Sequence, residues 1–238
     1  MDIGKAFTFP FDDEDWVKKL IIGAVLLIIP VVNFITFGYM IRTLRNVAEG
    51  QAKPLPEWDQ WGDDFMKGLL VVVAAFIYSL PIVLVNVITA ILGAVAGSAE
   101  SQGAQGVMAL CTTVLSCLSG LWGLVVGIVI PAAVVKYAQE GEFGSFFKFS
   151  EIFQWIRDNL KNYIIALLVI IVARILAALG VIACGIGVLF TMFWATVTMG
   201  HILGQVVAQA NPPAAPAATS YGDYTPPSPT ISGEGEGV

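Results

Sequence analysis

Long apolar runs that carry almost no charge are the feature that most restricts what this chain can fold into. Five such segments are present, and the first begins after Lys18 and Lys19. The other four run approximately over residues 68–97, 107–135, 163–184 and 186–207. An α-helix rises about 1.5 Å per residue, so about 20 apolar residues cross a hydrocarbon core of about 30 Å. Each of the four later segments is long enough to span a membrane.

The composition points to lipid rather than water as the surrounding solvent. The chain is 57% hydrophobic and 13% charged, whereas a soluble domain is usually about 25% charged. Lipid cannot satisfy open strand edges, and the runs lack the alternation of a membrane barrel. The sequence therefore predicts an all-α, polytopic membrane helix bundle whose main partner is the lipid bilayer.

Positive charge predicts the orientation of this bundle. Lysine and arginine gather in two long polar segments, residues 42–67 and 136–161, and are missing from the short loop 98–106. An excess of these residues marks cytoplasmic loops. We therefore expect both long segments and the C-terminus on the cytoplasmic side of a cell membrane. The net charge of −6 argues against a nucleic acid partner.

The first apolar segment, residues 20–41, leaves two topologies open. It contains "LIIPVVNFITFGYMIR", with Pro30 inside it. Proline removes a backbone donor and kinks or ends a helix. The segment is therefore either one kinked span or a re-entrant hairpin of two half-helices that turns at Pro30. The hairpin would keep Lys5, Lys18 and Lys19 on the cytoplasmic side, as the other loop charges suggest.

Similar boundaries recur along the chain and suggest three hairpin repeats. "FDDEDWVKKLIIG", "WGDDFMKGLLVV" and "WIRDNLKNYIIALL" each place an aromatic residue and a lysine ahead of apolar residues. "GYMIRTLRNVAEG", "PAAVVKYAQEGE" and "GHILGQVVAQANPP" each end an apolar segment with an amphipathic turn. One start and one end make a hairpin, and the first copy would be a compressed, re-entrant one. Alternatively, all cytoplasmic boundaries look alike because Trp, Tyr and Lys favour headgroup depth.

The polar segments are interpreted as cytoplasmic interfacial amphipathic helices. "SFFKFSEIFQWIRDNLKNY" repeats apolar residues at helical spacing, and "PLPEWDQWGDDFMKG" aligns Trp58, Trp61 and Phe65. They could anchor the chain at the interface or form a partner-binding groove. The composition also divides the chain into a membrane domain, residues 1–209, and a Pro/Gly-rich tail, residues 210–238. We expect the tail to be disordered and cytoplasmic, and it could dock a protein partner.

Three polar residues in the apolar segments form a candidate intramembrane polar site: Arg174, Asn86 and Asn33. A central arginine costs about 2.5–3.5 kcal/mol on insertion scales. Arg174 could neutralise an anionic substrate or pair with Asn86, or it could snorkel to the outer headgroups. No Asp or Glu lies deep within a span, and no catalytic, cofactor-binding or metal-ligand pattern appears. We therefore expect no enzymatic activity, no cofactor and no metal.

Pairs of glycines at G-x-x-x-G spacing predict close packing between helices. They are Gly93 with Gly97, Gly123 with Gly127, and Gly200 with Gly204. Small residues at this spacing let two helix backbones approach each other. The pairs could serve the bundle of one chain or the interface of a homo-oligomer.

The sequence "IPVVNFITFGYMIRTLRNVAEG…PLPEWDQWGDDFMKGL" resembles the domain of unknown function 4013 family of prokaryotic multi-pass membrane proteins. The resemblance is strongest over residues 7–81, in the pieces G-Y-x-x-R and L-P-E-W-D, and extends to about residue 209. It implies a bacterial or archaeal membrane protein but carries no activity and no functional residues. Two functions stay open: a non-enzymatic membrane-organising or assembly protein, or a small-solute permease or channel subunit.

Overall fold

The computed structural model describes residues 1–98, 101–182 and 185–211, and over these residues all regular secondary structure is helical, with no strand. The α-helices are α1 (Ile3–Thr8), α2 (Trp16–Ile28), α3 (Phe34–Ala48), α4 (Trp61–Ser98), α5 (Gln102–Glu140), α6 (Phe149–Asp158), α7 (Leu160–Leu179) and α8 (Gly187–Ala210). Three short 3-10 turns, Phe9–Asp12, Phe143–Phe147 and Gly180–Ile182, link some of them. The all-α prediction is confirmed, whereas most of the predicted tail lies outside the described residues.

Four helical stretches of the described chain are long and apolar enough to cross a membrane. They are Trp61–Gly97, Gln102–Glu140, Leu160–Ile182 and Gly187–Ala210. They correspond to the four later apolar segments of the sequence, and they confirm the prediction of a helical protein with several helices long and apolar enough to span a membrane. The helices extend past most of the predicted ends because polar residues continue them: α4, for example, begins with the acidic turn that contains Asp63 and Asp64.

The first apolar segment is two helices, and neither is among the candidate spans. α2 ends at Ile28 and α3 begins at Phe34, so Pro30 lies in a break. Val31 in this break has a φ of 72°, a left-handed conformation that a β-branched residue rarely adopts. The segment is thus not one continuous helix. The re-entrant hairpin and the threefold repeat stay predictions.

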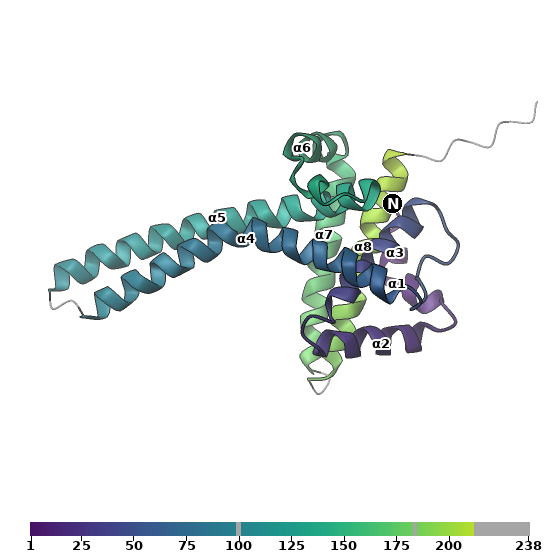
Figure 1. The fold of residues 1–238 in the computed structure, drawn as a ribbon, viewed down its shortest axis with the longest axis horizontal. Coiled ribbons are helices and arrows are strands. Elements are labelled where there is room, and N and C mark those ends of the chain that lie inside the picture. Colours follow the sequence, from purple (N-terminus) through teal and green to yellow (C-terminus); the bar gives the residue numbers. More distant parts are fainter. Residues whose placement is uncertain (99–100, 183–184, 212–238) are drawn as a thin grey trace, which may run out of the picture.

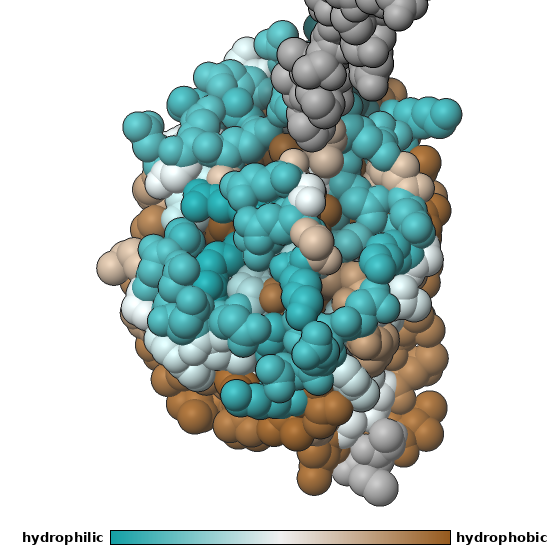
Figure 2. All heavy atoms as spheres, turned by 90° about the vertical axis from the view of Figure 1, so that its right-hand side faces the viewer, coloured by the Kyte–Doolittle hydropathy of each residue, from teal (hydrophilic) through white to brown (hydrophobic). Residues whose placement is uncertain are grey.

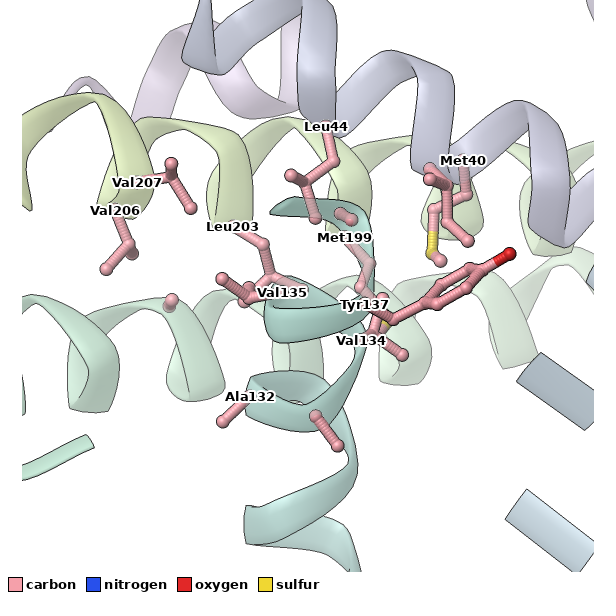
Figure 3. Packing of buried hydrophobic residues seen from close by; sticks show 14 of the residues in the cluster. Met40, Leu44, Ala132, Val134, Val135, Tyr137, Met199, Leu203, Val206 and Val207 are labelled. Atoms are coloured by element: carbon pink, nitrogen blue, oxygen red, sulfur yellow. The ribbon is translucent and has the colours of Figure 1, made fainter. Parts of the chain in front are cut away.

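The centre of the fold is the second half of α8. Helices α3 and α7 pack along it, and α1, α2 and α5 add further contacts. In Figure 3, Met40 and Leu44 of α3 point toward the α8 residues Met199 and Leu203 and the end of α5. This side of the molecule therefore has a conventional, closely packed apolar core.

Helices α4 and α5 form a long hairpin that leaves this core. Figure 1 shows the pair extending far to one side of α7 and α8. The first part of α4 packs on α3, and the rest of it runs beside α5. A hydrogen bond of 2.9 Å from Trp122 Nε1 to the Tyr78 carbonyl connects α5 to α4 where the two helices leave the core. The described fold thus has two parts that can carry a functional site: the core and this projecting hairpin.

The two expected interfacial helices differ from each other. α6 is a helix with Ile152 buried, while Phe149 and Phe153 are exposed. The other expected helix starts only at Trp61, so Trp58 belongs to the preceding loop. Prolines 54 and 56 in that loop keep residues 53 and 55 out of a helix, because the residue before a proline is pushed out of helical conformation.

Candidate functional site

One face of the core is rich in charged residues. Figure 2 shows this hydrophilic face, which is the right-hand side of Figure 1. It is formed by the N-terminal residues 1–19 and the loop 49–60, and we call it the polar cap. Its exposed charged residues are Asp2, Lys5, Asp12, Glu14, Asp15, Lys18, Glu49, Lys53, Glu57 and Asp59.

The acidic run at residues 12–15 is bound by lysines. Lys5 Nζ lies 2.6 Å from Asp12 Oδ2, and Lys53 Nζ lies 3.0 Å from Glu14 Oε1. Lys19, whose side chain is 2% exposed, lies 2.8 Å from Asp13. The described residues hold no group of three or more acidic, histidine or cysteine side chains placed for a metal ion. The acidic run therefore ties the N-terminal segment to α2 and to the loop.

A second set of contacts surrounds Arg42 of α3. Its Nη1 lies 2.8 Å from Asp59 Oδ1, and its Nη2 lies 2.8 Å from Asp64 Oδ2. Nη2 also donates to the Glu57 carbonyl (2.5 Å). The Asp64 side chain is only 1% exposed. We call Arg42 with these three partners the Arg42 cluster; it clamps the loop and the start of α4 onto α3.

Arg42 also sets the pH behaviour of Asp59. The hydrogen bond from Arg42 lowers the pKa of the Asp59 carboxyl below its ordinary value. A carboxyl whose folded-state pKa is depressed contributes stability at neutral pH, and this contribution is lost as the pH falls through that depressed pKa. The Arg42–Asp59 pair should therefore hold at neutral pH and weaken only in acid.

Tyr39, one turn before Arg42, completes the attachment of the loop. Its hydroxyl donates to the Pro56 carbonyl (2.6 Å), and its ring stacks on Trp58 with centroids 4.1 Å apart. Trp58 Nε1 in turn donates to the Lys19 carbonyl (3.2 Å). Burial acts to lower the pKa of Lys19, but Asp13 and Glu57 outweigh it and raise that pKa above its ordinary value. Lys19 therefore stays charged at neutral pH.

We expect Tyr39→Phe to destabilise the protein by about 1–2 kcal/mol, because the buried Pro56 carbonyl loses its donor. Chemical unfolding of the purified protein in mixed micelles, followed by tryptophan fluorescence, would measure the change. Thr8→Ala is the matched control: it removes an exposed hydroxyl that also donates to a carbonyl, and it should change stability by less than about 0.5 kcal/mol. Equal effects of the two substitutions on stability would contradict the role assigned to the hydrogen bond between Tyr39 and Pro56.

The sequence-predicted polar residues are not joined by hydrogen bonds or ion pairs. Arg174 lies half-buried on α7 and makes neither kind of contact with the described residues. Asn86 is exposed on α4, where its carbonyl accepts a bond from Thr89 (2.9 Å). The buried Oδ1 of Asn33, in the break before α3, has no partner among the described residues. Arg174 and Asn86 thus lie on two different helices, and Asn33 lies in the break between two others.

The glycine pairs also lie in different settings. A Cβ at Gly200 would lie 2.6 Å from the Met40 carbonyl oxygen, and one at Gly204 equally close to that of Leu44. This pair therefore lets α8 approach α3. In contrast, no other described segment comes within 4 Å of the Cβ position at Gly93, Gly97 or Gly127, and among the described residues only Ile82 approaches that of Gly123, at 3.9 Å.

These last four glycines lie on the projecting hairpin. We define the apolar arm as residues 80–98 of α4 and 102–128 of α5. Its large exposed apolar side chains are Leu80, Val83, Leu84, Val87, Ile88, Ile91, Val95, Val107, Leu110, Val114, Leu118, Leu121, Trp122, Leu124, Val125 and Ile128. They occur on the outer faces of both helices. An exposed apolar surface of this extent marks a protein or membrane contact.

Sequence reasoning missed the Arg42 cluster, although one signal was available. Gly38 precedes Arg42 by one helical turn, and Gly68 follows Asp64 by one turn. Residues four apart share a helix face, so each helix carries a small residue beside a charge. The pieces G-Y-x-x-R and L-P-E-W-D, which carry the family resemblance, supply Tyr39 and Arg42 on one side and most of their loop partners on the other.

Comparison with known proteins agrees with this resemblance. The family model described as "Protein of unknown function (DUF4013)" matches residues 21–186. This range contains the Arg42 cluster and the whole apolar arm. No curated protein and no solved structure matches the chain. Because the match covers more than half of the sequence, the chain belongs to the DUF4013 family.

Proposed function

We propose that this chain is a non-enzymatic membrane-organising or assembly protein of a bacterial or archaeal cell membrane, with both termini on the cytoplasmic side. The observation that carries the proposal is the apolar arm, which is exposed on the outer faces of both of its helices. The polar cap and α6 would hold the base of the arm at the cytoplasmic surface. The arm itself would meet lipid and the helices of a second copy or of another membrane protein.

The surface chemistry of the arm supports a contact with other helices. Apolar side chains alone give helices no reason to leave lipid, whereas small and weakly polar residues let them pack and hydrogen-bond. The arm exposes Asn86, Thr113 and Ser116 together with its glycines. An exposed amide in hydrocarbon favours a partner that can bond to it.

Cysteine cross-linking in reconstituted vesicles tests the proposal. Cys111 and Cys117 are exposed on α5, and with a cysteine at Ser116 they sample different faces of the arm. Each would be the single cysteine of a variant that lacks the other native ones, including Cys184. We expect oxidation to give a covalent dimer from at least one arm position. A cysteine at Val172, an exposed apolar position on α7, is the control and should stay monomeric.

The permease alternative makes the opposite prediction. An arginine with no partner among the described residues could bind an anionic solute, and Arg174 is such a residue. The same vesicles would be loaded with a small anionic tracer. Tracer efflux that Arg174→Ala abolishes, without cross-linking at any arm position, would overturn the assembly proposal in favour of a permease or channel subunit.

A further inference from the structure

A groove of about 310 Å³ opens where the polar cap meets the start of α2. The residues that matter for its chemistry are Lys18, Ile22, Glu57, Trp58, Asp59 and Trp61. They come from α2, the loop 49–60 and the first residue of α4. Lys19 also lines it, so the groove combines two lysines, two carboxylates, two indole rings and the apolar side chain of Ile22.

Lys18 is the available cation of this groove. Its neighbour Lys19 is buried and bound by both Asp13 and Glu57. Lys18, in contrast, is exposed and makes no hydrogen bond or ion pair with the described residues. A free ammonium at a groove wall is a suitable partner for one phosphate group.

The other side of the groove is suited to a cation. The side chains of Glu57 and Asp59 are 67% and 60% exposed, and each uses one oxygen in an ion pair with Lys19 or Arg42. Their remaining lone pairs can accept further hydrogen bonds. The rings of Trp58 and Trp61 lie 5.5 Å apart beside them, and indole faces attract ammonium groups.

The residues of the groove are of the kinds that concentrate at lipid headgroups. Tryptophan and lysine concentrate at the membrane interface, and here both occur at helix starts. α2 also exposes a stripe of Val17, Ile21, Val25 and Ile28, which begins next to Lys18 and continues along the helix. Figure 2 shows the hydrophilic face giving way to an apolar band at its lower edge. A headgroup in the groove would leave its acyl chains beside this stripe.

We propose that this groove binds the headgroup of a zwitterionic phospholipid of the phosphatidylethanolamine type. Lys18 binds the phosphate, and the ammonium lies between the carboxylates of Glu57 and Asp59 and the two indole rings. A primary ammonium donates hydrogen bonds to both carboxylates, which a quaternary ammonium cannot do. The same carboxylates repel a purely anionic headgroup, so the groove selects against phosphatidylglycerol.

Native mass spectrometry of the full chain in detergent, titrated with phosphatidylethanolamine or phosphatidylglycerol of matched chains, tests this assignment. We expect one phosphatidylethanolamine to be retained preferentially, and Lys18→Ala to weaken its binding about tenfold. Lys161→Ala is the matched control: Lys161 is an exposed lysine at the start of α7 that also makes no hydrogen bond or ion pair with the described residues. The Lys161→Ala variant should bind phosphatidylethanolamine as tightly as the unmodified chain does.

A second variant separates the two halves of the site. Glu57→Gln keeps the size of the side chain but removes its charge, and it should reduce the preference for phosphatidylethanolamine over phosphatidylglycerol. The proposal is overturned if Lys18→Ala retains the lipid as well as Lys161→Ala does. It is equally overturned if the unmodified chain binds phosphatidylglycerol as tightly as phosphatidylethanolamine.

Discussion

Gly38→Ala and Gly68→Ala are each expected to destabilise the protein by about 2–3 kcal/mol, at the upper end of what overpacking costs. A Cβ at Gly38 would lie 1.9 Å from the Asp64 carbonyl oxygen, and one at Gly68 would lie 1.7 Å from that of Phe34. Both obstacles are backbone atoms, so no side-chain rotation can relieve the clash. Helices α3 and α4 would have to separate.

This separation would also disturb the Arg42 cluster, because the residue that Gly38 contacts is Asp64 itself. Unfolding in mixed micelles, monitored by tryptophan fluorescence, would give the free energy change. Gly62→Ala is the control, since Gly62 lies on α4 like Gly68 but has no other described segment within 4 Å of its Cβ position. Alanine is the better helix former, so that variant should be neutral or slightly stabilised. Unfolding of Gly38→Ala at the same denaturant concentration as Gly62→Ala would show that the helices are not in backbone contact.

The long helices could be predicted from the sequence because their signal is contained in each segment alone. A run such as residues 163–184 is apolar over enough positions to require a helix in lipid, whatever its neighbours do. For the same local reason, Pro30 limits the first apolar segment to two alternatives, one kinked span or a hairpin that turns at the proline. The outcome, two helices too short to be candidate spans, depends on α3 packing between α4 and α8.

The glycine pairs show that a local sequence pattern does not reveal which helix packs against it. Gly93 with Gly97 and Gly200 with Gly204 have identical spacing, yet among the described residues only the second pair faces another helix. What lies opposite a glycine is decided by the packing of distant segments. The partners of Arg42 were hidden for a related reason: Asp59 and Asp64 reach it only after the loop 49–60 folds back over α3. No periodicity along the sequence encodes such a return.

Arg42→Ala is expected to destabilise the fold by about 3–5 kcal/mol, because it would leave the buried Asp64 carboxylate without its cation. It would also remove the donors to Asp59 and to the Glu57 carbonyl, which hold the loop. Arg42→Lys should recover only part of the loss, since one ammonium cannot reproduce the planar fork that bonds all three partners. The same unfolding measurement in micelles would determine both values.

Lys67→Ala is the appropriate comparison for this variant. Lys67 pairs with the half-exposed Asp63 one turn away on α4, and such a pair contributes less than about 1 kcal/mol. The double variant Arg42→Met with Asp64→Leu should be more stable than Arg42→Ala, since it removes the buried charge together with its partner. If Arg42→Ala were no more destabilising than Lys67→Ala, the loop would not depend on the cluster. The motif pieces G-Y-x-x-R and L-P-E-W-D would then need an explanation outside the folding of this chain.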